Sequence, residues 1–337
     1  MKIRNNKGIT LIVLILIIIT ILILSSIISI YSNSITQRAQ ITGKVIARKI
    51  DIDKEIEQNE KLMGITDVKG EGIIINILDG KDLIHQEDLI ILVDELKNAG
   101  SQAISINGQR VINSTYIYCD GGVILIDGKK IGNPFEIKAI GNKEIIYGSL
   151  TRNKGYIETL KNDGIEIKVE KQDEIFINKT NKEITSYNPR QGKIERLYNS
   201  NKIVGKSSFQ GKGVDILIEE NKVKLTALSF LQLVNDLNSA GAKAISINGQ
   251  RIVNMTDMMD ISEKYVLINS TPVEAPYFIE VIGNSEKIID TLNYNNSYIS
   301  KIKEKGNNVE INKNLNIKIN SYEQKRDQNK MDIDYLK

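Results

Sequence analysis

The sequence predicts an α+β protein made of two tandem β-α-β-β-β-β-α-β modules behind an N-terminal transmembrane helix. Three observations predict this organisation: an uncharged apolar run near the N-terminus, an internal duplication, and a regular change between strand-like and helix-like hydrophobic patterns within each copy. The length of 337 residues also suits two domains of ordinary size.

The apolar run covers residues 9–30, ITLIVLILIIITILILSSIISI, and has no charge in its 22 residues. At about 1.5 Å per residue, a helix of this length crosses about 30 Å of hydrocarbon. We therefore expect a transmembrane helix at 9–30, preceded by a cytoplasmic tail at 1–8. A cleaved secretory signal is an alternative, although its apolar region would be shorter.

A second alternative rests on Lys7-Gly8 and the apolar residues that follow, which resemble the leader boundary of type IV prepilins. A peptidase cuts those leaders after the glycine, so the chain would become a pilin-like surface component processed after Gly8. Such proteins carry a glutamate five residues beyond the glycine, where this chain has Val13. The departure argues against assembly into a pilus and leaves processing open.

Charge is unevenly distributed along the chain. Residues 1–50 hold seven basic side chains and no acidic one, so with a total charge of +3 the remainder carries −4. Lys2, Arg4 and Lys7 favour a cytoplasmic N-terminus, although further basic residues follow the apolar run. We expect a single-pass protein of the cell membrane with an extracytoplasmic C-terminal body. The mildly acidic body gives no reason to expect a nucleic-acid partner.

The duplication is the most informative feature. Residues 92–113 align without gaps to residues 233–254, with identity at 14 of 22 positions that include the octapeptide AISINGQR. The match extends upstream to paired G-x-G motifs and downstream to the segments PFEIKAIGN and PYFIEVIGN. We expect a first module at 64–178 and a second module at 206–320.

Each copy predicts the same elements. In the first copy a strand at 72–78 precedes a helix near 88–98, and AISI followed by Asn-Gly predicts a β-hairpin. Two further strands (VILIDGKKIG and PFEIKAIG), a helix over 147–162 and a last strand at 165–177 complete the module. We expect a sheet with its helices on one face.

Three segments lie outside the modules. Residues 31–63 are polar with apolar residues at helical spacing, which predicts a stalk helix that could pair as a coiled coil in a homo-oligomer. Residues 179–205 are rich in Asn and Lys and are expected to form a linker with any second stalk. Residues 321–337 are charged and predict a flexible tail.

With these motifs in view, the chain resembles a bacterial family known as domain of unknown function 881, the YlxW/YlxX-like proteins. The resemblance covers 64–178 and 206–320, through the AISINGQR hairpin, the Pro-aromatic-x-Ile strand ending in Ile-Gly-Asn and the Ile-rich closing strand. It implies a single-pass envelope protein with a stalk, connected with cell-envelope assembly or division and with an envelope protein partner. It implies no catalytic residue. This chain departs from the family pattern in having two modules and a short stalk.

The octapeptide holds the candidate site residues. The hairpin turn explains Asn107, Gly108, Asn248 and Gly249, because a type I′ turn needs positive φ at both central positions. Neither turn nor strand requires the other four, which are the candidate interaction residues Gln109, Arg110, Gln250 and Arg251. Arginine presents a planar set of donors that suits carboxylate or phosphate, so one hypothesis is an anion or peptide contact. The other is an ion pair with a carboxylate of the same module.

Catalytic, metal and cofactor sites are not expected. His85 and Cys119 are the single histidine and cysteine, and the second copy has Thr226 and Asp260 in their places. One cysteine excludes an intramolecular disulfide, and the G-x-G at Gly70 lacks the third glycine of a dinucleotide site. We therefore expect a membrane-anchored scaffold or interaction protein and not an enzyme.

Overall fold

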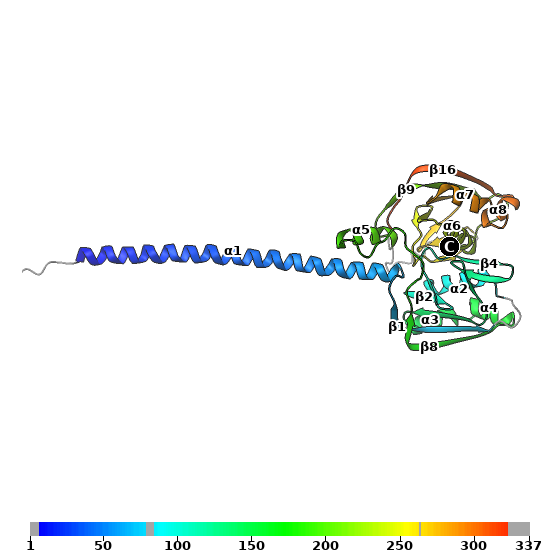
Figure 1. Ribbon diagram of the computed structural model, residues 1–337, viewed down its shortest axis with the longest axis horizontal. Coiled ribbons are helices and arrows are strands. Elements are labelled where there is room, and N and C mark those ends of the chain that lie inside the picture. Colours follow the sequence, from blue (N-terminus) through cyan, green and yellow to red (C-terminus); the bar gives the residue numbers. More distant parts are fainter. Residues whose placement is uncertain (1–6, 79–83, 263, 323–337) are drawn as a thin grey trace, which may run out of the picture. The chain divides into compact units, whose positions relative to one another are not determined.

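The computed structural model describes residues 7–78, 84–262 and 264–322. The chain divides into two compact units, residues 1–55 and a body at 56–337. Helix α1 (Lys7–Leu62) makes up the described part of the first unit, and its last turns belong to the body (Figure 1). Most of the expected tail at 1–8, and the expected tail at 321–337 beyond Tyr322, lie outside the described residues.

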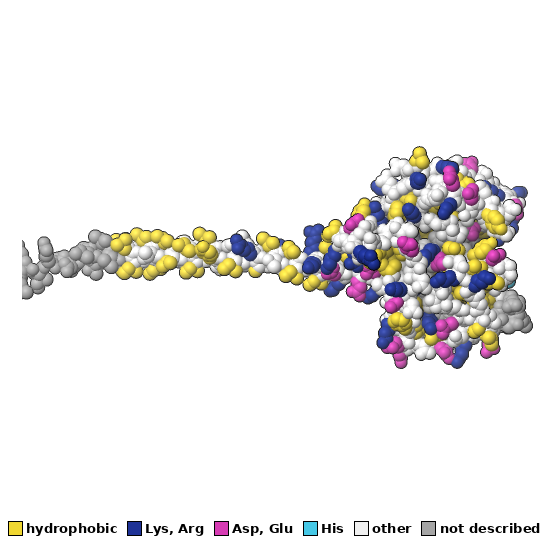
Figure 2. All heavy atoms as spheres, in the orientation of Figure 1, with side chains coloured by type: hydrophobic (Ala, Val, Ile, Leu, Met, Phe, Trp, Pro, Cys, Tyr) yellow, Lys and Arg dark blue, Asp and Glu magenta, His cyan; other side chains and the backbone are white. Residues whose placement is uncertain are grey.

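Helix α1 is one uninterrupted helix that covers the expected membrane span at 9–30 and nearly all of the expected stalk helix at 31–63. No proline occurs between the apolar run and the body, so nothing removes a hydrogen bond of the helix. Every side chain from Leu14 to Ile30 is exposed, and Figure 2 shows apolar side chains along this part. By length and composition, α1 can span a membrane.

The first module is built around an antiparallel sheet. In chain order its elements are β1 (Val68–Leu78), α2 (Gln86–Asn98), β2 (Ala103–Ile106), β3 (Gln109–Val111), β4 (Ile117–Asp120), β5 (Val123–Ile126), β6 (Lys129–Ile131), β7 (Phe135–Ile140), α3 (Lys143–Leu150), α4 (Tyr156–Asn162) and β8 (Glu166–Ile177). Five strands form a sheet of order β3-β2-β7-β1-β8, and β4, β5 and β6 form a separate three-stranded meander.

The second module repeats this arrangement. Its elements are α5 (Lys193–Ile203), β9 (Phe209–Glu219), α6 (Ala227–Ser239), β10 (Ala244–Ile247), β11 (Gln250–Arg251), β12 (Met258–Asp260), β13 (Val266–Ile268), β14 (Thr271–Val273), β15 (Tyr277–Ile282), α7 (Ser285–Asn293), α8 (Tyr298–Glu304) and β16 (Asn308–Ile319). The large sheet has the order β11-β10-β15-β9-β16 and the meander is β12-β13-β14. The two copies therefore share one fold.

The predicted order within a module was too simple. The segment VILIDGKKIG forms β5 and β6, because Asp127 and Gly128 both have positive φ (50° and 78°) and make a tight turn. Strand β4, which was not predicted, pairs with β5. The single helix predicted over 147–162 is two helices: the Asn142 side chain caps the start of α3, and Gly155 starts α4 after a break.

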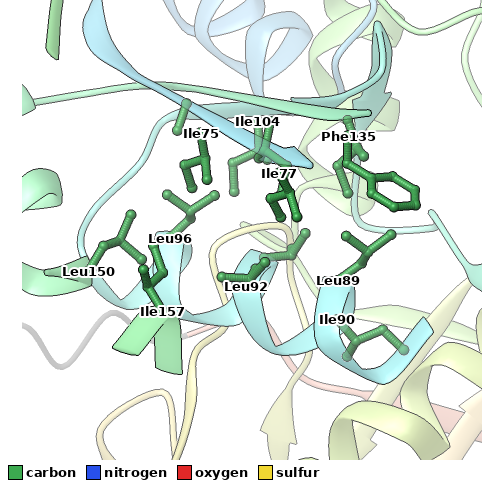
Figure 3. Packing of buried hydrophobic residues seen from close by; sticks show 14 of the residues in the cluster. Ile75, Ile77, Leu89, Ile90, Leu92, Leu96, Ile104, Phe135, Leu150 and Ile157 are labelled. Atoms are coloured by element: carbon green, nitrogen blue, oxygen red, sulfur yellow. The ribbon is translucent and has the colours of Figure 1, made fainter. Parts of the chain in front are cut away.

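The core of each module lies between the large sheet and its helices. In the first module, Ile75 and Ile77 alternate toward one face of β1, as a half-buried strand requires. Leu89, Leu92 and Leu96 of α2 recur at helical spacing and pack against them (Figure 3). All five side chains are completely buried. The core therefore forms where helix α2 packs on one face of the sheet.

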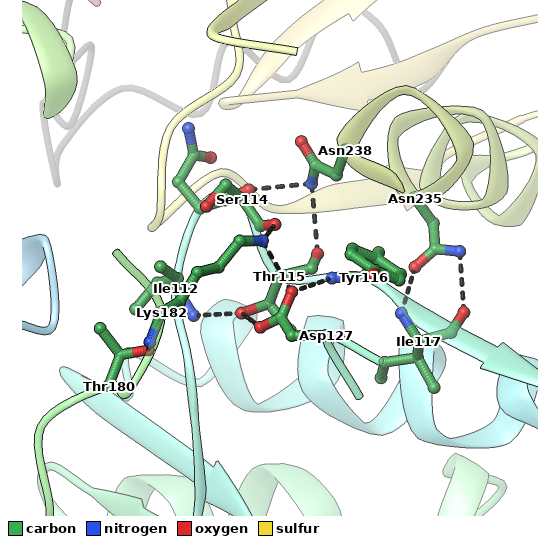
Figure 4. Close-up of polar contacts among 11 residues, drawn as sticks. Ile112, Ser114, Thr115, Tyr116, Ile117, Asp127, Thr180, Lys182, Asn235 and Asn238 are labelled. Carbon is green, nitrogen blue, oxygen red and sulfur yellow. Dashed lines mark hydrogen bonds and ion pairs between the residues drawn. The ribbon is translucent and has the colours of Figure 1, made fainter. Parts of the chain in front are cut away.

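The two modules meet through equivalent helices. Helices α2 and α6 pack against each other and lie between the two large sheets (Figure 1). Asn235 of α6 accepts a hydrogen bond from the Ile117 N–H at 2.7 Å and donates to the Ile117 carbonyl at 2.9 Å (Figure 4). Asp94, the equivalent residue of α2, accepts from the Met258 N–H at 3.2 Å. Helix α6 of the second module therefore binds β4 in the meander of the first module, and α2 of the first module binds β12 in the meander of the second.

A helix precedes each module. The expected linker at 179–205 contains α5, which ends at Ile203, the position equivalent to the end of α1 at Leu62. The Asn59 amide of α1 donates to Ser200 Oγ at 2.9 Å and to Asn201 Oδ1 at 2.7 Å. The ends of α1 and α5 are therefore joined to each other inside the body.

Candidate functional site

The octapeptide forms the same tight hairpin in both modules. Strands β2 and β3 pair Ile106 with Gln109, and β10 and β11 pair Ile247 with Gln250. The two central turn residues have φ values of 44° and 75° in the first copy and 45° and 78° in the second. Positive φ at both positions is the type I′ geometry that Asn-Gly favours, and it matches the right-handed twist of the strands.

The asparagine of each turn also ties the hairpin to another part of the sheet. Asn107 donates through Nδ2 to the carbonyls of Gly132 (2.9 Å) and Pro134 (3.2 Å) and accepts from the Glu136 N–H (2.7 Å). Asn248 makes the equivalent contacts with Glu274, Pro276 and Phe278. The amide side chain therefore satisfies the main chain that leads into β7 or β15, a role that turn geometry alone did not predict.

The two arginines bind the ends of the helices that precede their modules. Arg110 Nη2 donates to the Lys61 carbonyl in the last turn of α1 at 3.1 Å. Arg251 Nη2 donates to the Lys202 carbonyl in the last turn of α5 at 2.9 Å. The last carbonyls of a helix have no partner within the helix and carry partial negative charge, so a guanidinium is a suitable cap.

The surroundings of the arginines differ between the copies. Arg251 Nη1 also donates to the Asn320 carbonyl at 3.3 Å, and its guanidinium lies 5.8 Å from the centre of the Phe209 ring. Arg110 Nε and Nη1 have no hydrogen-bond partner among the described residues. Burial lowers the pKa of both arginines to about 10, and the Asp67 carboxylate acts against this at Arg110. Both remain cations at neutral pH.

The arginines lie inside the body, where they contact the ends of helices. Arg110 and Arg251 are each 3% exposed, and their hydrogen bonds within the described residues go to main-chain carbonyls and not to a carboxylate. The sequence could not show this acceptor, because a helix end offers carbonyls whatever its side chains are. The arginines fasten each module to its preceding helix.

The glutamines form the outer part of the octapeptide. Gln109 is partly exposed, and its Oε1 accepts from Lys129 Nζ at 3.2 Å across the meander. Gln250 is also partly exposed at the equivalent place. They are the candidate interaction residues that the fold leaves accessible.

Several polar contacts of the body were missed from the sequence. Asn59, Asp94, Ser200 and Asn235 all lie on buried helix faces and join helices or modules. The signal was available in the self-alignment, because Asp94 and Asn235 occupy one position within an otherwise apolar stripe. A polar residue kept at that place in both copies indicates a contact inside the protein.

The remaining chemistry-bearing side chains have local roles. His85 and Thr226 are the N-cap residues of α2 and α6. The Cys119 N–H donates to Gln86 Oε1 at 2.7 Å, and its thiol is free. Within the described ranges, no three His, Cys, Asp or Glu side chains come together where they could hold a metal ion.

The chain is similar in sequence to known bacterial proteins. It is 30% identical to UPF0749 protein YlxW of Bacillus subtilis over 129 residues, which is 35% of this chain and 56% of YlxW. It is 25% identical to UPF0749 protein YlxX of the same organism over 151 residues, which is 42% of this chain and 62% of YlxX. The chain thus spans between half and two thirds of these relatives.

A solved structure, described as an uncharacterized conserved protein from Mycobacterium tuberculosis, has 23% sequence identity and a TM-score of 0.37. The match covers 41% of this chain and 97% of that chain.

A family model described as "Bacterial protein of unknown function (DUF881)" matches the chain twice, at residues 55–188 and 196–332. Each match begins within the helix that precedes a module, α1 or just inside α5, so the family unit includes the helix end that the arginine binds. The resemblance seen in the sequence is confirmed, and the chain belongs to the DUF881 family, of which it contains two tandem copies.

Proposed function

We propose that this protein is a single-pass, membrane-anchored scaffold that presents a double DUF881 body to a protein partner on the extracytoplasmic side of the cell membrane. The observation that carries the proposal is the contact of Arg110 with the Lys61 carbonyl. It joins the most characteristic motif of the module to the helix that also contains the apolar run. A motif used in this way supports a role in holding and presenting the body.

The use of the other recurrent polar residues supports a role without catalysis. Asn107 and Asn248 bind main-chain groups of their own sheets, and both arginines bind helix ends. Catalytic groups need to reach a substrate, and these side chains are occupied within the fold. Gln109 and Gln250, which are partly exposed, are the proposed partner-facing residues of the octapeptide.

The proposed orientation is tested by labelling with a membrane-impermeant maleimide in intact cells. The background is Cys119→Ser, which removes the single cysteine. Leu315→Cys, at a position that is 84% exposed, is expected to react from outside. Asn5→Cys is expected to react only after permeabilisation. If Asn5→Cys reacts in intact cells and Leu315→Cys reacts only after permeabilisation, the body is cytoplasmic and the proposed orientation is wrong.

The proposed partner contact is tested by placing a photo-crosslinking amino acid at Gln109 or Gln250 in the full chain within cells. The matched control is Lys168 on the edge strand β8, which is exposed and distant in sequence from both hairpins. Mass spectrometry should identify one envelope protein crosslinked at both hairpin positions and absent at Lys168. Equal crosslinking at all three positions would reject the hairpins as the partner surface.

A plain anchor and a pilin-like component differ in the mass of the mature protein. The scaffold proposal expects the intact chain, with Met1–Gly8 still present. Loss of those residues would instead indicate processing after Gly8 and a pilin-like surface component. An envelope or division role is tested separately, because the crosslinked partner should then belong to that machinery.

A further inference from the structure

A cavity of about 850 Å³ lies between the two modules, on the side where the helices α1 and α5 end. Both copies contribute the same positions to its wall: Ile112 and Val253 follow the hairpins, and Met63 and Val204 follow the helix ends. The volume is within the range of sites that enclose a small molecule, about 300–1,000 Å³. Each copy alone supplies one half of the wall, so the cavity exists because the module is duplicated.

Part of the cavity wall is apolar. Phe209, Val253 and Met255 line it on the side of the second module, together with Ile203 from the end of α5. Apolar and aromatic walls of this kind remove the apolar part of a ligand from water, which supplies most of the free energy of binding for a small molecule. Methionine also adapts its shape to different ligands.

The charged residues of the wall are mainly cationic. Among the described residues that line the cavity are Lys182, Lys206 and Lys243 against one acidic residue, Glu183. Lys182 is already engaged, since its Nζ lies 2.7 Å from Asp127 Oδ1 and also donates to the Ser114 carbonyl (Figure 4). Lys243 forms no salt bridge with any described residue. It is the cation that a ligand could neutralise.

The position of Lys243 marks a difference between the two halves. The equivalent residue of the first copy is Gln102, which also lines the cavity but has no charge. An anionic group would therefore be attracted to the half formed by the second module, to which Phe209 and Met255 also belong. Lys243 is exposed, so its attraction for an anion is screened by water and should weaken as salt is added.

We propose that this cavity binds an amphipathic anion, a small molecule with an apolar body and one carboxylate or phosphate group. The anionic group lies at Lys243, and the apolar body lies against Phe209, Val253 and Met255. This inference rests on the cavity alone and is independent of the proposed scaffold role. A lipid and a water-soluble metabolite are both sources of this chemistry.

The test uses the full chain in nanodiscs with a fluorescent residue inside the cavity. The protein contains no tryptophan, so Phe209→Trp creates a single reporter that keeps an aromatic ring at the wall. The anionic probes are 12-bromododecanoate and 12-bromododecyl phosphate, whose bromine quenches tryptophan at short range. The control probe is 12-bromododecyltrimethylammonium, which has the same chain and a cationic head. Free inorganic phosphate as a competitor separates a headgroup-only site from an amphiphile site.

Both anionic probes are expected to quench the reporter saturably, with half-saturation at a concentration at least about tenfold below that of the cationic probe. Lys243→Gln, which copies the side chain of Gln102, should weaken the anionic probes about fivefold or more. Lys212→Gln is the matched control, because Lys212 is exposed on β9 and does not line the cavity. It should leave binding unchanged.

The proposal would be overturned by an absence of quenching, by equal quenching by anionic and cationic probes, or by binding that Lys243→Gln does not weaken. Displacement by inorganic phosphate at concentrations as low as those of the bromododecyl probes would reject the apolar body as part of the site. Circular dichroism must show that Phe209→Trp unfolds like the parent chain. If it does not, Tyr322→Trp at the same cavity serves as the reporter, and the same outcomes decide.

Discussion

The two modules use equivalent residues for nearly the same contacts, and the places where they differ show which contacts the fold needs. Arg110 and Arg251 both bind a helix end, and Asn107 and Asn248 both bind the main chain before a central strand. The copies differ where each module's helix binds the meander of the other module: the first copy uses Asp94 and the second uses Asn235.

The difference at this contact is chemical. Asn235 has a donor and an acceptor, and it satisfies both the N–H and the carbonyl of Ile117. An ionised Asp94 can only accept, from the Met258 N–H and from Asn98 Nδ2 at 3.0 Å. Burial raises the pKa of Asp94 to about 7, with Lys97 acting against the shift. The same position is therefore occupied by an uncharged amide in the second copy, Asn235, and by a titratable carboxyl group in the first copy, Asp94.

Removing an arginine is expected to destabilise the protein more than any other substitution considered below. Arg251→Ala should lower the free energy of unfolding by about 4 kcal/mol and Arg110→Ala by about 2–3 kcal/mol. The order follows from their contacts, because Arg251 binds two carbonyls and packs on Phe209 whereas Arg110 binds one. Chemical unfolding of the full chain in detergent, followed by circular dichroism, measures both. Equal losses, or a larger loss at Arg110, would show that the number of carbonyls bound by each arginine does not govern its contribution to stability.

Asp94→Asn removes the chemical difference between the two copies at the contact between the modules. Because the pKa of Asp94 is raised in the folded state, the folded protein binds this proton more tightly than the unfolded chain. The contribution of Asp94 to stability should fall as pH rises from about 4 through about 7 and stay low above that. Asp94→Asn should therefore stabilise the protein by about 2 kcal/mol at pH 8, less than the full shift because the attraction to Lys97 is lost.

The measurement is the difference in unfolding free energy between wild type and Asp94→Asn across pH 4 to 8. This difference isolates Asp94 from Asp236, whose pKa burial also raises, to about 6. A difference that is flat with pH would show that Asp94 does not titrate in this range. Lys97→Met in parallel should reduce stability at pH 8 more than at pH 5, since it removes the cation that offsets the Asp94 charge.

The third prediction separates the two roles of the turn asparagines. Asn107→Gly and Asn248→Gly keep the positive φ of the turn and remove the side-chain hydrogen bonds. Each should lower the free energy of unfolding by about 1–1.5 kcal/mol, and the two losses should add, because the sites share no partner. Thermal denaturation of the single and double variants is the test. A neutral effect would mean that the turn alone explains these residues.

The smallest effect is expected at the glutamines. Gln109→Ala and Gln250→Ala change partly exposed side chains, so each should alter the free energy of unfolding by less than about 0.5 kcal/mol. If either variant destabilises the protein by 2 kcal/mol or more, the glutamines belong to the fold and lose their place as partner-facing residues.

The sequence predicted the duplication, the apolar helix and the hairpin, because each depends on a local pattern of residues. It did not predict the split of the helix over 147–162 or the division of VILIDGKKIG into two strands. In both places a single polar side chain or Asp-Gly pair decides the outcome inside an otherwise continuous pattern. The acceptor of Arg110 was not predictable at all, since it is a main-chain carbonyl 49 residues away in the sequence.

Each arginine fastens its own module to the helix that precedes it. Hydrogen exchange with mass spectrometry on the full chain in nanodiscs tests it most directly. Arg110→Met is predicted to accelerate exchange in residues 59–64 and to leave residues 200–205 unchanged, and Arg251→Met is predicted to do the opposite. If both variants accelerate exchange throughout the body, or neither changes the helix ends, the arginines do not hold these helices.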